Sequence, residues 1–200
     1  MTVLYLIVAR SGSKRLPGKN LKEIEGVTLT GYKCLAAKKS KSCSLAMIST
    51  DSPQIADVAR QYGVAVPFIR PAELATDLAT TEDVVRHAMA WCEDIHGVSH
   101  PEAIQLLEPS SPFVRPADYD AAVAMLENDR SVNCVFGKVL YLFRWDHLKT
   151  HQDLYDGPLR RQASYKIPPG YDVDINDAND LAGAEWLAGD GVVNLSWAKT

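Results

Sequence analysis

The 200-residue sequence predicts a single α/β domain over residues 1–200, with a mostly parallel sheet between helices. Short apolar runs alternate with amphipathic stretches of helical length, which is typical of βαβ units. The first run, VLYLIVA at residues 3–9, is apolar on both faces, as a central parallel strand must be. A chain of this length buries roughly 70% of its unfolded surface. It can therefore form a full core.

The same alternation continues along the chain. A helix is predicted over residues 51–63. Ser52 is at an N-cap position, Pro53 is at the first helical position and Gly63 is at the end. Further helices are expected at 80–96, 116–129 and 177–189. Strands are expected at 44–49, 64–70, 103–108, 131–140 and 171–175, with a last ordered segment at 192–197.

The alternation breaks between about residues 141 and 170. Aromatic, basic and proline residues occur there without a clear period. A segment of this length cannot build an independent core. We therefore predict an irregular excursion from the sheet, not a second domain.

Composition excludes several classes of function. The formal net charge of -4 argues against a general affinity for nucleic acid or anionic membranes, since both need a basic surface. The longest apolar run is too short to cross a bilayer and lacks the flanks of a signal peptide, so a cytoplasmic protein is expected. The histidines show no zinc-binding spacing, and no C-x-x-C pair is present, which predicts reduced thiols at Cys34, Cys43, Cys92 and Cys134.

The turn after the first strand, ARSGSKRLPGKNL at residues 9–21, is the strongest functional signal. Ligands of doubly wound sheets bind outside the carboxyl ends of the strands, and a glycine-rich turn there offers N–H groups to an anion. Gly12 and Gly18 permit close backbone approach. Four basic side chains could neutralise a polyphosphate: Arg10, Lys14, Arg15 and Lys19. The spacing does not match the P-loop, and a solvated basic loop remains the alternative.

This turn closely resembles the signature of the CMP-sialic acid synthetases, the acylneuraminate cytidylyltransferases. Other matches follow in that family's order: STDS at 49–52, RPAELATDLATTEDVVRHAM at 70–89, LLEPSSPFVRPADYDAA at 106–122 and VDINDANDLAGAE at 173–185. The resemblance implies a Rossmann-type nucleotidyltransferase fold, a three-layer αβα sandwich. It also implies a homodimer that transfers CMP from CTP to an acidic sugar, such as a nonulosonic acid, with Mg²⁺ and release of pyrophosphate.

The resemblance also implies residue roles at the nucleotide. Arg10 and Lys19 correspond to catalytic phosphate contacts, with Ser13 and Lys14 beside them. Asn20 corresponds to a ribose contact. The cytosine edge corresponds to Arg70 and Thr81, assisted by the backbone up to Ala9. The alternative for Thr81 is a helix cap.

The metal motif departs from the family pattern of Asp-x-Asp followed by Thr-x-x-Asp-Leu. In one register the metal pair falls on Asp174 and Asn176, and in another on Asp172 and Asp174. Asp174 is common to both and is predicted to be catalytic, while Asp172 would share its strand face. The alternative makes Asn176 or Asp177 only a helix cap.

The acceptor side departs as well. The family's LLQPTSP is LLEPSSP here, so Glu108, near Ser110, replaces an amide that contacts the sugar, and a carboxylate would repel an acidic acceptor. The family's dimerisation lobe corresponds to the excursion, which is short here. Its arginines, the candidates to meet the acceptor's anion, are Arg144, Arg160 and Arg161. Two alternatives stay open: a cytidylyltransferase for a phosphonate or other non-sugar acid, and an inactive nucleotide-binding protein.

Overall fold

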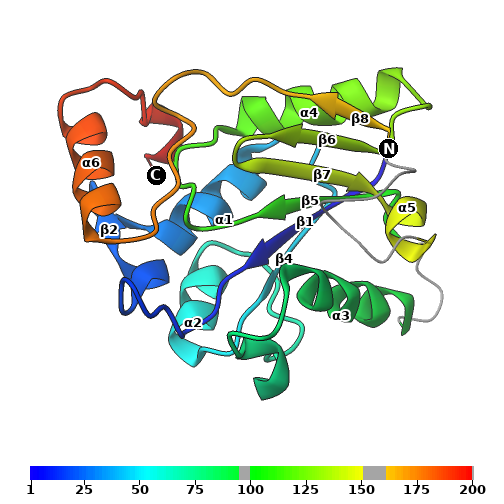
Figure 1. Cartoon of the computed structure of the whole chain (residues 1–200), viewed down its shortest axis with the longest axis horizontal. Coiled ribbons are helices and arrows are strands. Elements are labelled where there is room, and N and C mark those ends of the chain that lie inside the picture. The colour runs from blue at the N-terminus through cyan, green and yellow to red at the C-terminus, as the bar shows by residue number, and fades with distance from the viewer. Residues whose placement is uncertain (95–99, 151–160, 200) are drawn as a thin grey trace.

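The computed structural model describes residues 1–94, 100–150 and 161–199. Its centre is a six-stranded sheet with the order β4-β1-β5-β7-β6-β8 (Figure 1). The strands are β1 (Val3–Val8), β4 (Leu45–Ser49), β5 (Ala103–Leu107), β6 (Cys134–Gly137), β7 (Leu140–Arg144) and β8 (Gln162–Ser164). Strand β1 runs parallel to β4 and β5, and β8 runs parallel to β6. Only β7 runs antiparallel to its neighbours in this sheet, so the predicted mostly parallel sheet is confirmed.

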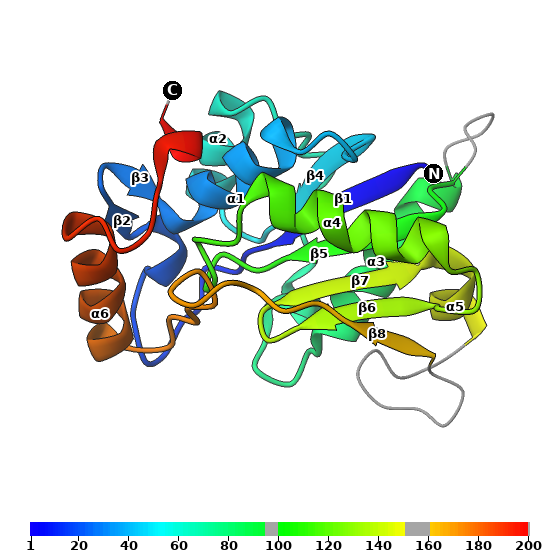
Figure 2. The same cartoon turned by 90° about the horizontal axis from the view of Figure 1, so that it is seen from above.

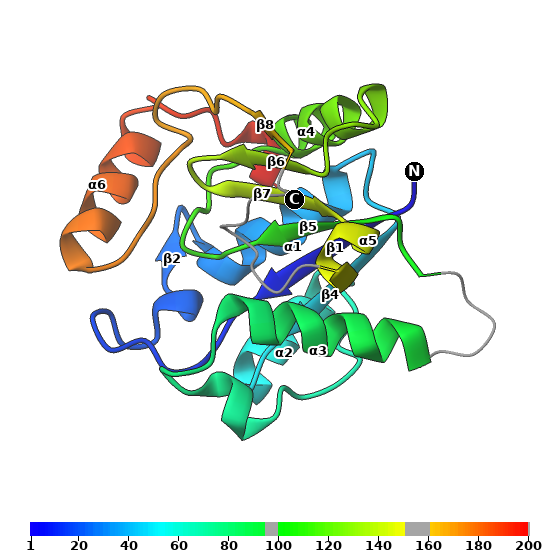
Figure 3. The ribbon, with the colours of Figure 1, turned by 45° about the vertical axis from the view of Figure 1, so that its right-hand side comes forward.

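Helices cover both faces of the sheet, which confirms the three-layer α/β architecture (Figures 2 and 3). The odd-numbered residues of β1 pack with α1 (Leu29–Lys39), α2 (Pro53–Gln61) and α4 (Pro116–Asn128). The even-numbered residues pack with α3 (Thr81–Asp94) and α5 (Trp145–Thr150). Successive side chains of a strand point to opposite faces, so both sets must be apolar. This explains the unbroken apolar run at residues 3–9.

A third apolar cluster lies beside the sheet. Helix α6 (Ala178–Gly189) stands at one side of the molecule next to the small hairpin of β2 (Glu23–Ile24) and β3 (Val27–Thr28), as Figure 1 shows. The cluster joins Ala184 of α6 to Ile24, Tyr32, Phe113 and Ile175. Three short 3-10 helices complete the described elements: η1 (Lys19–Leu21), η2 (Ala72–Ala75) and η3 (Ser196–Ala198).

Several predicted boundaries were wrong. Residues 64–70 contribute one bridge, between Met47 and Ala65, instead of a strand, because Pro67 lacks the N–H that would extend the ladder. The expected strand 131–140 is interrupted after Gly137 and becomes the hairpin β6–β7. Strand β7, helix α5 and strand β8 therefore occupy part of the expected irregular excursion. Residues 171–175 form no strand, and 192–197 ends in η3.

The sequence pattern missed helix α1. Its first nine residues are all buried, including Lys33, so the helix has no polar stripe to reveal its period. Thr28 caps its amino end by accepting a hydrogen bond from the N–H of Gly31. No helix within the described ranges is long and apolar enough to cross a membrane.

Gly63 ends helix α2 in the left-handed region, at φ 70°. We expect Gly63→Ala to lower the free energy of unfolding by about 1 kcal/mol, because a Cβ is strained at that φ. Gly183→Ala is the matched control, since Gly183 lies inside α6 with nothing within 4 Å of the added Cβ. It should raise stability by roughly 0.5–1 kcal/mol. Urea unfolding measures both, and equal effects would contradict the assignment.

Candidate active site

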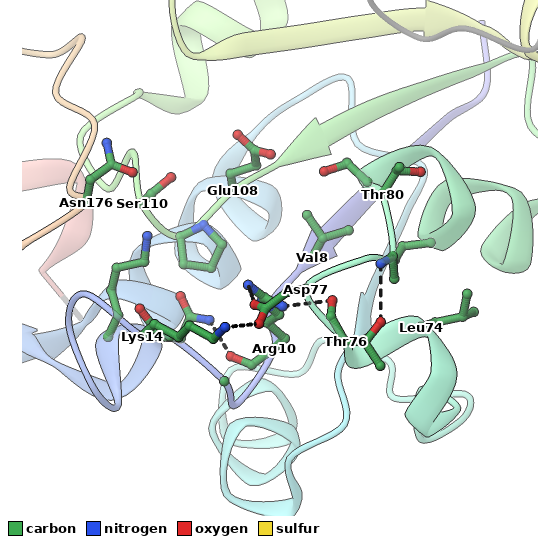
Figure 4. Close-up of a pocket in the computed structure, with 18 of the residues that line it drawn as sticks. Val8, Arg10, Lys14, Leu74, Thr76, Asp77, Thr80, Glu108, Ser110 and Asn176 are labelled. Atoms are coloured by element: carbon green, nitrogen blue, oxygen red, sulfur yellow. Dashed lines mark hydrogen bonds and ion pairs between the residues drawn. The ribbon is translucent and has the colours of Figure 1, made fainter.

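A cavity of about 600 Å³ lies at the carboxyl ends of β1 and β5 (Figure 4). Four segments that are far apart in the chain line it: the turn after β1, the stretch from η2 into α3, the turn after β5, and the segment before α6. Most of the predicted site residues come together here, namely Arg10, Ser13, Lys14, Lys19, Asn20, Arg70, Thr81, Glu108, Ser110, Asp174 and Asn176.

The turn after β1 is held in shape by side chains from neighbouring segments. The side-chain amide of Asn20 donates to the carbonyl of Arg10, at 2.8 Å. The N–H and hydroxyl of Ser11 donate to the carboxylate of Asp51, at 2.7 and 2.5 Å. Gly18 adopts φ 67° before η1. Asp51 therefore positions the turn, a role that its place directly after β4 could have indicated.

The basic side chains of the turn meet different partners. Lys19 is half-buried and its Nζ donates to the carbonyl of Ile175, at 2.8 Å. Burial lowers the pKa of Lys19, whereas the charges of Asp174 and Glu108 act in the opposite direction. Arg15 donates to Oδ1 of Asn176, at 2.9 Å. The turn after β1 is thus tied to the segment before α6 across the cavity.

Arg70 and Thr81 lie at another wall of the cavity. The guanidinium of Arg70 is buried and donates to the hydroxyl and carbonyl oxygens of Ser49, at 3.0 and 2.5 Å. Burial lowers the pKa of Arg70 to about 10. The N-cap of α3 is Thr80, whose hydroxyl accepts a hydrogen bond from the N–H of Asp83, at 3.1 Å. Capping is therefore not the role of the Thr81 side chain.

Besides Asp77, two carboxylates line the cavity from separate segments, Glu108 after β5 and Asp174 before α6. Burial raises the pKa of Glu108, and the charge of Asp174 raises it further, while Lys33 and Lys19 lower it. The side-chain amide of Asn176 donates to Oδ2 of Asp174, at 3.0 Å. Asn176 also donates its backbone N–H to Asp180, whereas Asp177 forms the N-cap of α6.

Other predicted residues lie outside this cavity. Asp172 forms an ion pair with Lys138, at 3.2 Å, and lines a separate hollow. Because residues 171–175 are not a strand, the same-face argument that placed Asp172 beside Asp174 was wrong. Ala9 is buried and does not line the cavity. Its backbone N–H donates to the carbonyl of Ser49.

Arg144 and Arg161 lie at the opposite end of the sheet from the cavity, where the parallel strands begin. Arg144 ends the antiparallel strand β7, and its guanidinium donates to the carbonyls of Leu126 and Val132, at 2.5 and 2.7 Å. Arg161 directly precedes β8 and donates its N–H to Asn133, at 3.0 Å. The structure does not bring either arginine to the cavity of its own chain. Arg160 lies outside the described residues.

The cavity could hold a divalent cation through oxygen ligands. Magnesium is usually bound by one or two protein carboxylates, several waters and substrate phosphates. Asp174 and Glu108 supply two carboxylates, whereas Oδ1 of Asn176 is already used by Arg15. Within the described ranges, no three acidic, cysteine or histidine side chains gather closely enough to bind a metal. The donor set therefore fits a cation that shares its shell with a phosphate ligand.

Comparison with known proteins identifies the family. A family model described as cytidylyltransferase matches residues 4–157. The chain belongs to the cytidylyltransferase family. A structure of CMP:2-keto-3-deoxy-manno-octonic acid synthetase complexed with CTP shares the cytidylyltransferase fold seen here, with a TM-score of 0.73 and 15% identity over 95% of this chain and 99% of that one.

Curated relatives confirm the resemblance to the acylneuraminate cytidylyltransferases. The chain is 42% identical over 124 residues to the CMP-N,N'-diacetyllegionaminic acid synthase of Legionella pneumophila, covering 62% of this chain and 52% of that protein. It is 33% identical over 133 residues to the N-acylneuraminate cytidylyltransferase of Escherichia coli, covering 66% and 30%. These matches span about half or less of the relatives' own length.

Lys33 of α1 is a fully buried lysine that does not line the cavity. Its Nζ donates to the hydroxyl of Tyr119, at 2.9 Å, and burial lowers its pKa to about 7 despite the charges of Glu108 and Asp118. The unfolded chain therefore binds a proton at Lys33 between about pH 7 and 10 that the folded chain releases. For this reason, Lys33 makes the wild-type protein gain stability as the pH rises through that window.

We expect Lys33→Met to remove this gain, which is at most about 1.4 kcal/mol per pH unit. Urea unfolding at about pH 7, 8 and 9 measures the slope of stability against pH. Lys38→Met is the control, because Lys38 is exposed on the same helix and its curve should parallel the wild type. A slope unchanged by Lys33→Met would show that Lys33 stays protonated in the fold.

Proposed function

We propose that this protein is a CTP-dependent cytidylyltransferase that transfers CMP to an acidic sugar of the nonulosonic or related 2-keto type and releases pyrophosphate. One observation carries the proposal: the cavity gathers the basic turn after β1 on one side and the carboxylates Glu108 and Asp174 on another. A triphosphate needs the first group, and a metal-assisted attack by a hydroxyl needs the second. The relatives named for such reactions support it.

In the proposed reaction, the anomeric hydroxyl of the acceptor attacks the α-phosphate in line with the departing pyrophosphate. Charge then develops on the phosphoryl oxygens and on the leaving group. Arg10, Lys14 and Lys19 would stabilise that charge from the turn after β1. Lys19 is fixed by its bond to Ile175, so it needs little reorganisation as the charge develops. Arg70 and Thr81 would hold the base at the wall beside α3.

Magnesium would be held by Asp174, with Glu108, whose carboxyl feels the charge of Asp174, as a second carboxylate of the cavity. When bound, the ion would neutralise phosphate charge and polarise the phosphoryl oxygens. Burial raises the pKa of Glu108, and the nearby charge of Asp174 raises it further. The repulsion between these carboxylates supports a cation site between the turn after β5 and the segment before α6.

The cellular setting and assembly belong to the same proposal. All four cysteines are free thiols, and Cys34, Cys92 and Cys134 are buried, which suits the reducing cytoplasm. A homodimer is proposed from the family resemblance, and light scattering of the purified protein would test it.

The activity assay combines CTP, Mg²⁺ and a panel of acids that contains N-acetylneuraminic, legionaminic and 2-keto-3-deoxy-manno-octonic acids together with simple phosphonates. Pyrophosphate release with a sugar acid is the expected result. Release with phosphonates alone would favour the non-sugar alternative. CTP binding without release from any acid would favour an inactive nucleotide-binding protein. Equal turnover with ATP or GTP would contradict the proposed base site.

We expect Lys19→Ala and Asp174→Ala each to lower turnover by about a hundredfold or more while the fold is kept. Both side chains face the cavity, so their loss removes charge stabilisation but little core packing. Lys22→Ala, an exposed neighbour of η1, is the control for Lys19. Asp172→Ala is the control for Asp174 and separates the two metal registers. Turnover lost with Asp172→Ala but kept with Asp174→Ala would refute the metal assignment.

A further inference from the structure

The carboxylate of Asp77 joins two of the cations proposed to bind phosphate. Its Oδ1 accepts a hydrogen bond from Nη2 of Arg10, at 2.9 Å, and its Oδ2 accepts one from Nζ of Lys14, at 2.5 Å. Figure 4 shows these contacts inside the cavity. Nη1 of Arg10 also donates to the carbonyl of Thr76, at 2.8 Å. One short loop therefore meets both cations.

The Asp77 carboxylate contacts the two cations in the way that a phosphate group would. Two oxygens of one anion face an arginine and a lysine, as phosphate oxygens do in basic sites. The hydrogen bonds from Lys14 and Arg10 hold the pKa of Asp77 below its usual value, so the carboxylate is ionised at neutral pH. A triphosphate that reaches these cations meets an anion already in place.

The contacts can be broken at low cost. The side chains of Lys14, Asp77 and Arg10 are 81%, 47% and 35% exposed, and exposed ion pairs contribute little to stability. The preceding helix η2 has no buried residue. Leu78, next to Asp77, is 93% exposed. The loop can therefore leave the cations without uncovering core.

We infer that Asp77 is an internal competitor for the phosphate site: a phosphate group binds Arg10 and Lys14 by displacing the Asp77 carboxylate, and Asp77 returns when pyrophosphate leaves. The inference rests on the proposed function in taking these cations as phosphate ligands. Its consequence is selective. Asp77 lowers the affinity for ligands that carry phosphate and leaves the recognition of the nucleoside unchanged.

The test is the binding of pyrophosphate, CTP and cytidine to the wild-type protein and to Asp77→Asn, measured by calorimetry. Asparagine keeps the shape of the side chain and removes its charge. We expect pyrophosphate and CTP to bind about three- to tenfold more tightly to the variant, and cytidine to bind equally. The gain should shrink at high salt, because exposed charges are screened. Asp57→Asn is the control, since Asp57 pairs with Arg60 at 2.8 Å on the exposed face of α2.

Unchanged or weaker pyrophosphate binding by Asp77→Asn would overturn the inference and assign Asp77 the role of orienting the two cations. Failure of both proteins to bind pyrophosphate would also overturn the inference. The measurement needs no acceptor, so a protein that turns over no acid still tests it. Hydrogen exchange gives a second readout. Pyrophosphate should speed exchange at the N–H of Ala79, which bonds Oγ1 of Thr76 at 3.2 Å, and slower exchange there would contradict displacement of the loop.

Discussion

The complete burial of β1 is the constraint on which the rest of the structure depends. The strand lies between β4 and β5, so its backbone groups are paired on both edges, and residues 3–7 are fully shielded by helices on both faces. A polar group without a partner along such a strand carries a large desolvation cost, and the hydroxyl of Tyr5 is bonded to Ser40 and Ser42. Charged side chains enter only where β1 ends. The functional groups therefore gather in the turn that begins at Ala9.

Several cations around the cavity have an opposite charge close by. Lys19 interacts with Asp174 and Glu108, and Arg10 and Lys14 pair with Asp77. The charge of Glu108 also acts on the buried Lys33. A protein with a net charge of -4 can thus hold a concentrated basic turn. Such pairing limits repulsion between like charges, and it also means that an anionic ligand must exchange partners as it enters.

The sequence predicted the parts of the site that a local pattern encodes. The apolar run before Arg10 and the glycines of the turn predicted β1 and the basic turn that lines the cavity from sequence alone. The position of Asp172 could not be derived this way, because it depends on whether residues 171–175 pair with a neighbouring strand. Helix α1 was missed because burial on all sides removed its polar stripe. Lys33 was overlooked with it, since nothing in the sequence shows that a lysine is enclosed.

The acceptor end of the cavity has a physical requirement that follows from Glu108. A carboxylate there accepts hydrogen bonds and repels another acid unless a cation lies between them, so within the proposed function the substrate presents a hydroxyl or amine to whichever oxygen the cation leaves free and directs its own acid elsewhere. Arg144 and Arg161 lie at the other end of the strands, away from the cavity. Only the cavity's own cations are therefore left to bind that acid among the described residues of this chain. One of these cations is Arg15, which lines the cavity and donates to Asn176. The change from amide to carboxylate at position 108 thus constrains how the acid is oriented and does not exclude an acidic acceptor.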